Sequence, residues 1–286
     1  MFCPLRFDSA GGVRFDACRL APAIAKPRVT VAIPSLNQGR FLDTTLCSAF
    51  AQPVDIEVML VDGGSSDGSL GVIERWREQL VWCRSAPDKG QAAAINEAIS
   101  RGRAPFVCWL NSDDIYLPDG LAALVRAIEA DPLIDMVYGN CVLIDAQGRL
   151  IGRYRSRPFS LRSLSRRSII PQPATLIRRD AWERVGGLDE DLHFSLDYDL
   201  WWRLHRAGAR FKRIETDVAA LRQHPAAKSF VFARAQYTEA KSVMRRHTGS
   251  LPLIWRLREP LSVGARSGGK ALGYLARSWR RWSARL

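Results

Sequence analysis

Short apolar runs alternate with amphipathic stretches between residues 28 and 131. Four runs rich in β-branched and other apolar residues have the length of buried strands, and a polar or glycine-rich loop follows each of them. These predicted strands are residues 29–33, 56–61, 81–84 and 106–110. Helical spacing predicts helices at residues 41–50, 65–80, 91–100 and 121–130. Strands that alternate with helices predict βαβ units and an α/β fold, with a mainly parallel, Rossmann-like sheet flanked by helices.

The second half of the chain is less regular. The pattern predicts strands at residues 136–144, 150–154 and 174–177 and helices at residues 197–207 and 228–247. The first two of these strands are expected to pair as a hairpin. Asp180 is expected to cap a short helix that ends at Gly186-Gly187. Residues 1–27 show little periodicity and are expected to form an arm with weak structure.

Polar side chains follow each of the four predicted parallel strands. In an open α/β sheet, ligands bind in the crevice outside the carboxyl ends of the strands. The polar groups at these ends are Pro34-Ser35-Leu36-Asn37, Asp62, Asp88 and Asp113-Asp114. Ordinary loop polarity would explain each group singly, but not aspartates that directly abut hydrophobic strands. We therefore expect one binding site at this edge of the sheet.

The segment Asn111-Ser112-Asp113-Asp114 carries the strongest chemical signal. Two adjacent carboxylates repel each other unless a cation or hydrogen bonds lie between them. Magnesium and manganese typically bind one or two carboxylates and complete their coordination with substrate phosphates. The segment therefore predicts a Mg²⁺ or Mn²⁺ site that holds a diphosphate. The alternative is an Asx turn that caps the following helix.

Asp62 ends a predicted strand and is followed by Gly63-Gly64-Ser65-Ser66-Asp67-Gly68-Ser69. This loop lacks the G-K-[ST] ending of a P-loop and is not a G-x-G-x-x-G motif. Phosphate binding by its glycines is therefore weakly supported. A carboxylate that accepts a hydrogen bond from a nucleobase or ribose is the better interpretation.

Five segments, in this order, resemble the family 2 glycosyltransferases. They are V-A-I-P-S-L-N, E-V-M-L-V-D-G-G-S-S-D-G-S, D-K-G-Q-A-A-A-I-N, F-V-C-W-L-N-S-D-D and L-D-Y-D-L-W-W-R-L, and the resemblance covers residues 28–225. It implies the GT-A fold, in which a nucleotide-binding half lies beside a more variable acceptor half. It also implies a nucleotide-diphosphate sugar donor, a divalent metal and inversion at the anomeric carbon.

The resemblance implies roles for individual residues. Those implied to line the nucleotide pocket or contact the donor are Pro34, Asn37, Asp62, Asp88, Asn111 and Asp113. The N-S-D-D segment takes the place of the D-x-D motif, so Asp113 and Asp114 are expected at the metal. His224 matches a histidine near the metal and diphosphate. Asp197 matches the general base that takes the proton of the acceptor hydroxyl, whereas Asp199 is expected to point elsewhere on the same helix.

Three positions depart from the family pattern. Asn111 replaces the first acid of D-x-D, Gly63 stands where a second aspartate usually follows Asp62, and Leu196 stands where a glutamate often precedes the base. These changes affect details of metal and base contacts more than the class of protein. Among the other polar and aromatic residues, Gln172 is expected near donor or acceptor by analogy alone. Trp201 and Trp202 are expected in the core or the wall of the site.

The positive charge is concentrated at the end of the chain. The sequence has 42 Lys and Arg against 29 Asp and Glu, a net charge of +13. Eleven of these basic residues follow residue 240, against Glu259 alone. Residues 270–286 predict an amphipathic helix whose apolar stripe is Leu272, Leu275, Trp279, Trp282 and Leu286. A basic helix with tryptophans suits an anionic membrane surface; packing against its own domain is the alternative.

The composition argues against nucleic-acid binding and a membrane span, and indicates reduced cysteines. Carboxylates crowd the strand ends, which argues against nucleic-acid binding. No apolar run is long enough to span a bilayer and none resembles a signal peptide, so we expect a cytoplasmic protein, peripheral on the inner face of the membrane if the tail binds it. The six cysteines lack C-x-x-C spacing and are expected to be reduced thiols, most of them in the core.

The combined prediction is an inverting glycosyltransferase that uses a UDP-, GDP- or dTDP-sugar and a glycan or lipid-linked acceptor in surface polysaccharide or glycolipid synthesis. A non-catalytic nucleotide-sugar-binding or scaffold protein on the same fold is the alternative. The predicted organisation is an N-terminal arm (1–27), a GT-A domain (28–225) and a basic helical extension (226–286). Residues 28–131 form the nucleotide-sugar half of that domain and residues 132–225 the acceptor half.

Overall fold

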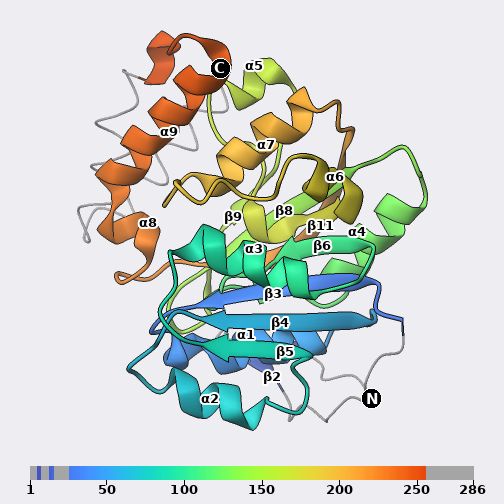
Figure 1. Ribbon diagram of the computed structural model, residues 1–286, viewed down its shortest axis with the longest axis vertical. Coiled ribbons are helices and arrows are strands. Elements are labelled where there is room, and N and C mark those ends of the chain that lie inside the picture. The colour runs from blue at the N-terminus through green and yellow to red at the C-terminus, as the bar shows by residue number, and fades with distance from the viewer. Residues whose placement is uncertain (1–4, 8–12, 16–25, 256–286) are drawn as a thin grey trace.

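The computed structural model describes residues 5–7, 13–15 and 26–255. The centre of the fold is one sheet of nine strands, in the order β5-β4-β3-β6-β10-β8-β11-β7, with β9 paired to β8 off this path. Helices cover both faces (Figure 1). A separate two-stranded sheet pairs β1 (Leu5–Phe7) with β2 (Val13–Phe15), within the region expected to have weak structure.

Residues 28–131 alternate strands and helices as the sequence pattern predicts, with one short strand, Ile115–Tyr116, that was not predicted. The elements are β3 (Val29–Ser35), α1 (Gly39–Phe50), β4 (Ile56–Asp62), α2 (Ser69–Arg75), β5 (Trp82–Ser85), α3 (Gln91–Arg101), β6 (Phe106–Trp109), β7 (Ile115–Tyr116) and α4 (Gly120–Glu129). Strands β5, β4, β3 and β6 are parallel, which confirms the predicted βαβ units. Their register aligns Ser35 with Asp62 and Asp62 with Ser85, so the strand ends form one edge. In Figure 1 the arrowheads of β3, β4 and β5 point left, toward this edge.

The remaining elements extend the sheet and cover it. They are β8 (Met136–Ile144), β9 (Leu150–Tyr154), α5 (Leu161–Leu164), a 3₁₀ turn (Gln172–Ala174), β10 (Thr175–Arg178), α6 (Arg179–Arg184), α7 (Leu196–Arg206), β11 (Phe211–Arg222), α8 (Lys228–Val231) and α9 (Ala233–Thr248). The hairpin of β8 and β9 is confirmed. Strand β10 joins the two halves because it pairs antiparallel with both β6 and β8.

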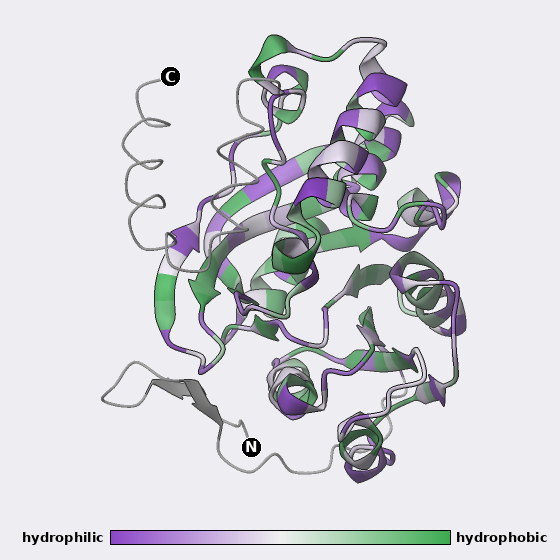
Figure 2. Cartoon of the chain, turned by 90° about the vertical axis from the view of Figure 1, so that its left-hand side faces the viewer, coloured by the Kyte–Doolittle hydropathy of each residue, from purple (hydrophilic) through white to green (hydrophobic). Residues whose placement is uncertain are grey.

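Two hydrophobic cores lie on opposite faces of the sheet. Alternation along β3 sends Val31 and Ile33 to one face, where they pack with buried side chains of α1, α2 and α4. Ala32 faces the other side, with buried side chains of α3 and α7. In Figure 2 the strands are largely green, whereas the helices alternate between green and purple along their length. The hydrophobic pattern thus positions helices on both faces and leaves the carboxyl edge open to loops.

Three details differ from the sequence-based predictions. Strand β11 was not predicted, because the first half of Phe211–Arg222 is polar and partly exposed. Asp180 is not the cap of α6: the helix begins at Arg179, and Asp180 lies in its first turn, where its charge favours the helix dipole. Helix α2 begins at Ser69 instead of Ser65, because the preceding residues form a loop held by Asp62.

The described segment that follows β11 packs on the domain. His247, in the last turn of α9, is buried and stacks on Trp202 of α7 with ring centroids 5.7 Å apart. Trp255 is also buried and donates to the carbonyl of Ser165. No helix within the described ranges is long and apolar enough to cross a membrane. Of the four cysteines in those ranges, three are buried.

Candidate active site at the carboxyl edge of the sheet

Asp62 organises the loop that follows β4. Its carboxylate accepts hydrogen bonds from the backbone N–H groups of Gly64 (3.1 Å) and Ser65 (2.9 Å), and from the hydroxyls of Ser65 (2.5 Å) and Ser85 (2.7 Å). The residue is fully buried. Asp62 lies at the predicted edge, but its oxygens already accept hydrogen bonds from the loop and from Ser85.

The loop after β3 is tied to the same structure. Asn37 has a left-handed backbone (φ 54°), its N–H donates to the Ser65 hydroxyl (2.7 Å), and its side-chain oxygen accepts from the Ser66 N–H (2.9 Å). Pro34 is buried in β3, opposite Val61 of β4. Both residues are at the edge where sequence analysis placed them. The side chain of Asn37 is exposed to solvent at this edge.

Asp88 presents the exposed carboxylate of this region. It accepts a hydrogen bond from the Gly90 N–H (2.8 Å) and lies over Gly63. A Cβ atom at Gly63 would come within 3.1 Å of Asp88 Oδ2. Gly63, which stands where the family often has a second aspartate, therefore leaves room for the carboxylate of Asp88. With glycine at this position, Asp88 is the one negative group beside residue 63; an aspartate there would add a second.

The two aspartates of the N-S-D-D segment point in different directions. Asp114 is buried; one of its oxygens accepts from the Arg222 N–H (2.9 Å) and the other from the Asn111 amide (3.2 Å). Burial, and then the charge of Asp113, raise the pKa of Asp114 well above its usual value. Asp114 therefore fastens the turn to β11 instead of facing the crevice.

Asp113 faces His224. The Asp113 Oδ2 atom lies 3.1 Å from His224 Nε2, and the His224 ring packs against Phe41 with centroids 4.8 Å apart. Arg222 donates to the carbonyl of Asp113 (2.8 Å) and so fixes the turn beneath this pair. Arg222 was not predicted from sequence; it is a buried arginine whose guanidinium donates to backbone carbonyls and packs over the Phe41 ring, for which no local motif exists.

The side chains of Asp113 and His224 suit a divalent metal that takes its remaining ligands from substrate and water. Within residues 5–7, 13–15 and 26–255, no group of three or more His, Cys, Asp or Glu side chains is placed to hold a metal. Of the three residues predicted as ligands, Asp113 and His224 come together, whereas Asp114 is turned into the sheet. One carboxylate and one imidazole fit an ion that takes its other ligands from substrate phosphates and water.

Asn111 lies in an amide network. Its oxygen accepts from the side chain of Gln91 (2.8 Å), and its NH₂ group donates to Asp114 and to Gln172 (3.3 Å). Gln172 also donates to the carbonyl of Trp109 (2.7 Å). An ionised aspartate at this position could only accept, so asparagine suits these neighbours. Gln91, the first residue of α3, was not identified from sequence, because glutamine at a helix start is commonplace.

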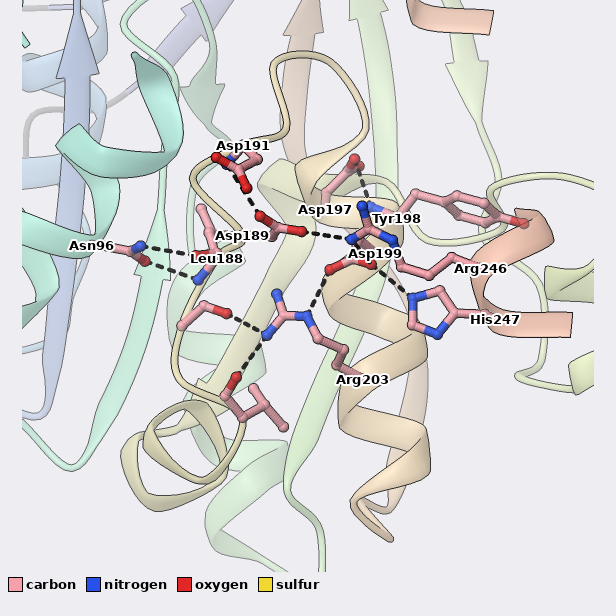
Figure 3. A network of polar contacts seen from close by, with 12 residues as sticks. Asn96, Leu188, Asp189, Asp191, Asp197, Tyr198, Asp199, Arg203, Arg246 and His247 are labelled. Carbon is pink, nitrogen blue, oxygen red and sulfur yellow. Dashed lines mark hydrogen bonds and ion pairs between the residues drawn. The ribbon is translucent and has the colours of Figure 1, made fainter. Parts of the chain in front are cut away.

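Asp197 lies in the first turn of α7, half-buried, with its carboxylate turned away from the Asp199 network (Figure 3). It accepts from the Tyr198 N–H (2.8 Å). Burial raises the pKa of Asp197 to about 6, and the negative charge of Glu239 adds to this effect. A carboxylate with such a pKa can accept a proton near neutral pH.

Asp199, two residues on, has a structural role. It is fully buried and accepts from Arg203 Nε (2.6 Å), while His247 Nε2 lies 2.7 Å from its other oxygen. Hydrogen bonds from His247 and Arg203 outweigh the effect of burial, so the pKa of Asp199 is lowered. Trp201 and Trp202 are buried beside it, as core residues.

Glu239 of α9 holds the loop that leads to Asp197. Its carboxylate accepts from the backbone N–H groups of His193 (3.0 Å), Phe194 (2.7 Å) and Ser195 (2.6 Å). This loop anchor was missed in the sequence, because Glu239 is separated from its partners by more than 40 residues and belongs to an otherwise ordinary helix.

Comparison with known proteins agrees with this architecture. The family model described as "Glycosyl transferase family 2" matches residues 30–185, more than half of the chain. The chain is 28% identical over 191 residues to a chondroitin synthase of Pasteurella multocida, covering 66% of this chain but only 20% of that protein. It is 27% identical over 291 residues to the succinoglycan biosynthesis protein ExoU of Rhizobium meliloti, covering 88% of this chain and 84% of that one.

Two solved structures share the fold. The mannosyltransferase PcManGT of Pyrobaculum calidifontis, in complex with GDP-Man and Mn²⁺, superposes with a TM-score of 0.62 at 20% identity, covering 94% of this chain and 83% of that one. S. aureus TarS 1–349 in complex with UDP gives 0.59 at 16% identity, covering 89% and 78%. The α/β fold is thus of the GT-A type. Because the family model covers more than half of its length, the chain belongs to the family 2 glycosyltransferases.

Proposed function

We propose that this enzyme transfers a sugar from a nucleotide-diphosphate sugar to an acceptor hydroxyl with inversion. The observation that carries the proposal is the Asp113–His224 pair at the strand ends, with Asp197 on the acceptor side. Three side chains, Glu239, Lys228 and Gln91, lie between Asp197 and the turn that carries Asp113. Glu239 lies close enough to Asp197 and to Lys228 to influence the pKa of both, and the Lys228 amine is 3.4 Å from Gln91.

The donor enters the crevice beyond β3, β4 and β5. Asn37 and Asp88 offer exposed polar groups for the base and ribose, while Asp62 and Pro34 form the wall behind them. PcManGT with GDP-Man and TarS with UDP hold nucleotide ligands on the same fold. The donor of this enzyme is accordingly a UDP-, GDP- or dTDP-sugar.

Asp197 acts as the general base. It takes the proton of the acceptor hydroxyl while the hydroxyl oxygen forms a bond to the anomeric carbon. The bond from that carbon to the donor phosphate oxygen breaks, and its electron pair stays on the departing nucleoside diphosphate. Attack from the face opposite the leaving group inverts the configuration, so one base is sufficient.

Asp113 and His224 would hold the divalent metal, while Asp114 and Arg222 fix the turn that carries Asp113. A bound Mg²⁺ or Mn²⁺ would supply positive charge against the diphosphate of the donor and leaving group. A neutral Asn111 leaves Asp113 as the single carboxylate of the N-S-D-D segment that faces the crevice. We therefore expect weak metal binding in the absence of the donor, and stronger binding when phosphate oxygens complete the site.

The acceptor is a glycan or a lipid-linked glycan of a surface polysaccharide. Support comes from the relatives, a chondroitin synthase and a succinoglycan biosynthesis protein. It also comes from an acid-free segment, residues 153–179, whose Arg155, Arg157 and Arg162 are exposed. Such a surface suits an acceptor that carries phosphate or carboxylate groups.

Donor binding tests the proposal. UDP-, GDP- and dTDP-sugars are titrated by calorimetry with and without Mn²⁺ into the wild type, Asp113→Asn and Asp55→Asn, an exposed aspartate away from this edge. We expect Mn²⁺-dependent binding of one donor, lost in Asp113→Asn and retained in the control. If no donor binds, a scaffold protein on the same fold becomes the better interpretation.

A further inference from the structure

Lys228, the first residue of α8, lies four residues after His224 and places a cation beside Gln91, the first residue of α3. Its amine lies 3.4 Å from the side-chain oxygen of Gln91 and 5.2 Å from the centroid of the Phe194 ring. No carboxylate pairs with it among residues 26–255. A lysine whose hydrogen bond is to a neutral amide has its charge available for a ligand.

The Lys228 amine is connected through Gln91 to the turn that carries Asp113. Gln91 donates to Asn111 (2.8 Å), and Asn111 belongs to the same turn as Asp113, which faces His224. Gln91 is also the first residue of α3, so the amine lies at a helix end that favours negative charge. Lys228 and His224 thus reach the N-S-D-D turn through different partners, Lys228 by way of Gln91 and Asn111 and His224 by its own contact with Asp113.

We propose that Lys228 binds the diphosphate of the donor and stabilises the nucleoside diphosphate as it leaves. When the bond between the anomeric carbon and the phosphate oxygen breaks, its electron pair adds negative charge to that oxygen. An ammonium group fixed beside it stabilises this charge in the transition state. The assignment rests on the proposed donor chemistry and adds a protein cation to the metal.

The surroundings of Lys228 agree with this role. Although the residue is exposed, its amine packs against Phe194 and Gln91, and this partial burial lowers the pKa of Lys228. Glu239, the nearest acid, already accepts three backbone N–H groups and counters that effect only through its charge. A diphosphate beside the amine would favour its charged form.

The test separates a phosphate ligand from a structural lysine. Lys228→Met removes the charge and keeps the length of the side chain, and Lys228→Arg keeps the charge. Lys212→Met is the matched control, because Lys212 also makes one long hydrogen bond, to the carbonyl of Ala127 at 3.4 Å, on β11 away from this edge. Each variant is titrated with the nucleoside diphosphate and the nucleoside monophosphate of the donor's base, and its melting temperature is recorded.

We expect Lys228→Met to weaken diphosphate binding about ten- to a hundredfold, to leave monophosphate binding and melting temperature unchanged, and to lower kcat. Lys228→Arg should restore part of the diphosphate affinity, and Lys212→Met should match the wild type. Equal losses for both nucleotides, or no loss for either, would overturn the assignment. If the wild type binds neither nucleotide, the proposed donor chemistry itself fails and Lys228 fails with it, which is a different pattern from failure in the variant alone.

Discussion

The pKa of Asp197 makes a direct prediction about the pH dependence of transfer. Its value of about 6 arises from burial, and the carboxylate must be ionised to accept the hydroxyl proton. Activity should therefore be full above this value and should fall about tenfold per pH unit below it. Initial rates measured between pH 5 and 8 at a saturating donor concentration would show this decrease in activity at acid pH. Rates that stay constant from pH 7 down to 5 would exclude Asp197 as the base.

Asp197→Asn should lower kcat by about a hundred- to ten-thousandfold, the usual contribution of a general base. Donor binding should remain, because Asp197 lies on α7 and not among the strand ends that hold the nucleotide. Calorimetry with the donor is the control for folding. A variant that loses donor binding together with activity would indicate structural damage instead of a missing base.

Glu239 offers a second change that acts on the base from outside the reaction. Its negative charge raises the pKa of Asp197, and its Oε1 atom accepts from Phe194 and Ser195. Glu239→Gln retains an oxygen for these two contacts and removes the charge. The acid limb of the rate should therefore move to lower pH, while the rate at pH 8 changes much less. A uniform loss of rate at every pH would show that Glu239 only holds the loop.

Residue identities in the strand-end loops could be predicted from sequence, but their orientations could not. Asp62 and Asp114 end hydrophobic runs, which marks them correctly as residues of the edge. The orientation of each carboxylate depends on hydrogen-bond donors that belong to other strands. The Ser85 hydroxyl donates to Asp62, and the Arg222 N–H donates to Asp114. Glu239 and Lys228 escaped notice for a related reason, because their partners are distant in sequence.

Helices and strands were predicted correctly where the spacing of apolar residues and the residues that end an element indicate the same boundaries. Most strands and helices from β3 to α4 follow this rule and begin and end within two residues of the expected positions; the exceptions are α2, which is shorter than predicted, and β7, which was not predicted. Strand β11 breaks it, because its first half is polar and its pairing with β8 spans more than 70 residues. Its existence follows from tertiary contacts that no short window contains.

The contact between α4 and β11 can be tested with a single methyl group. A Cβ atom at Gly120 would lie 2.1 Å from the carbonyl oxygen of Val218, which is backbone and cannot move aside cheaply. Gly120→Ala should therefore destabilise the fold by about 1–3 kcal/mol or more. Gly71→Ala is the matched control, since nothing lies within 4 Å of its Cβ in α2. It should raise stability by up to about 1 kcal/mol.

Thermal or urea unfolding of the two variants measures this difference. The informative quantity is the contrast between them, because both replace a helical glycine and differ in the space around it. Equal effects in the two variants would mean that α4 can shift on β11 without cost. Since β11 leads directly to Arg222 and His224, a destabilised Gly120→Ala protein should also bind Mn²⁺ and donor more weakly.

At the scale of the whole molecule, charge and function are distributed unevenly. The described residues carry the crevice, and α9 is fastened to α7 by the His247–Asp199 contact (Figure 3). The predicted amphipathic helix at residues 270–286 lies outside the described residues, so its membrane role stays a prediction. It is nevertheless sharply testable, because much of the net charge of +13 lies after residue 240.

If the predicted helix binds an anionic membrane surface, the protein should sediment with phosphatidylglycerol vesicles and not with phosphatidylcholine vesicles. Binding should weaken as salt is raised. Each basic residue near such a surface contributes about 1 kcal/mol, so the double change Arg280→Ala and Arg281→Ala should weaken binding about thirtyfold. Arg126→Ala with Arg210→Ala, two exposed arginines within the domain, is the matched control and should have little effect. Equal losses in both pairs would assign membrane attraction to overall charge, and no binding by the wild type would favour a helix that packs on its own domain.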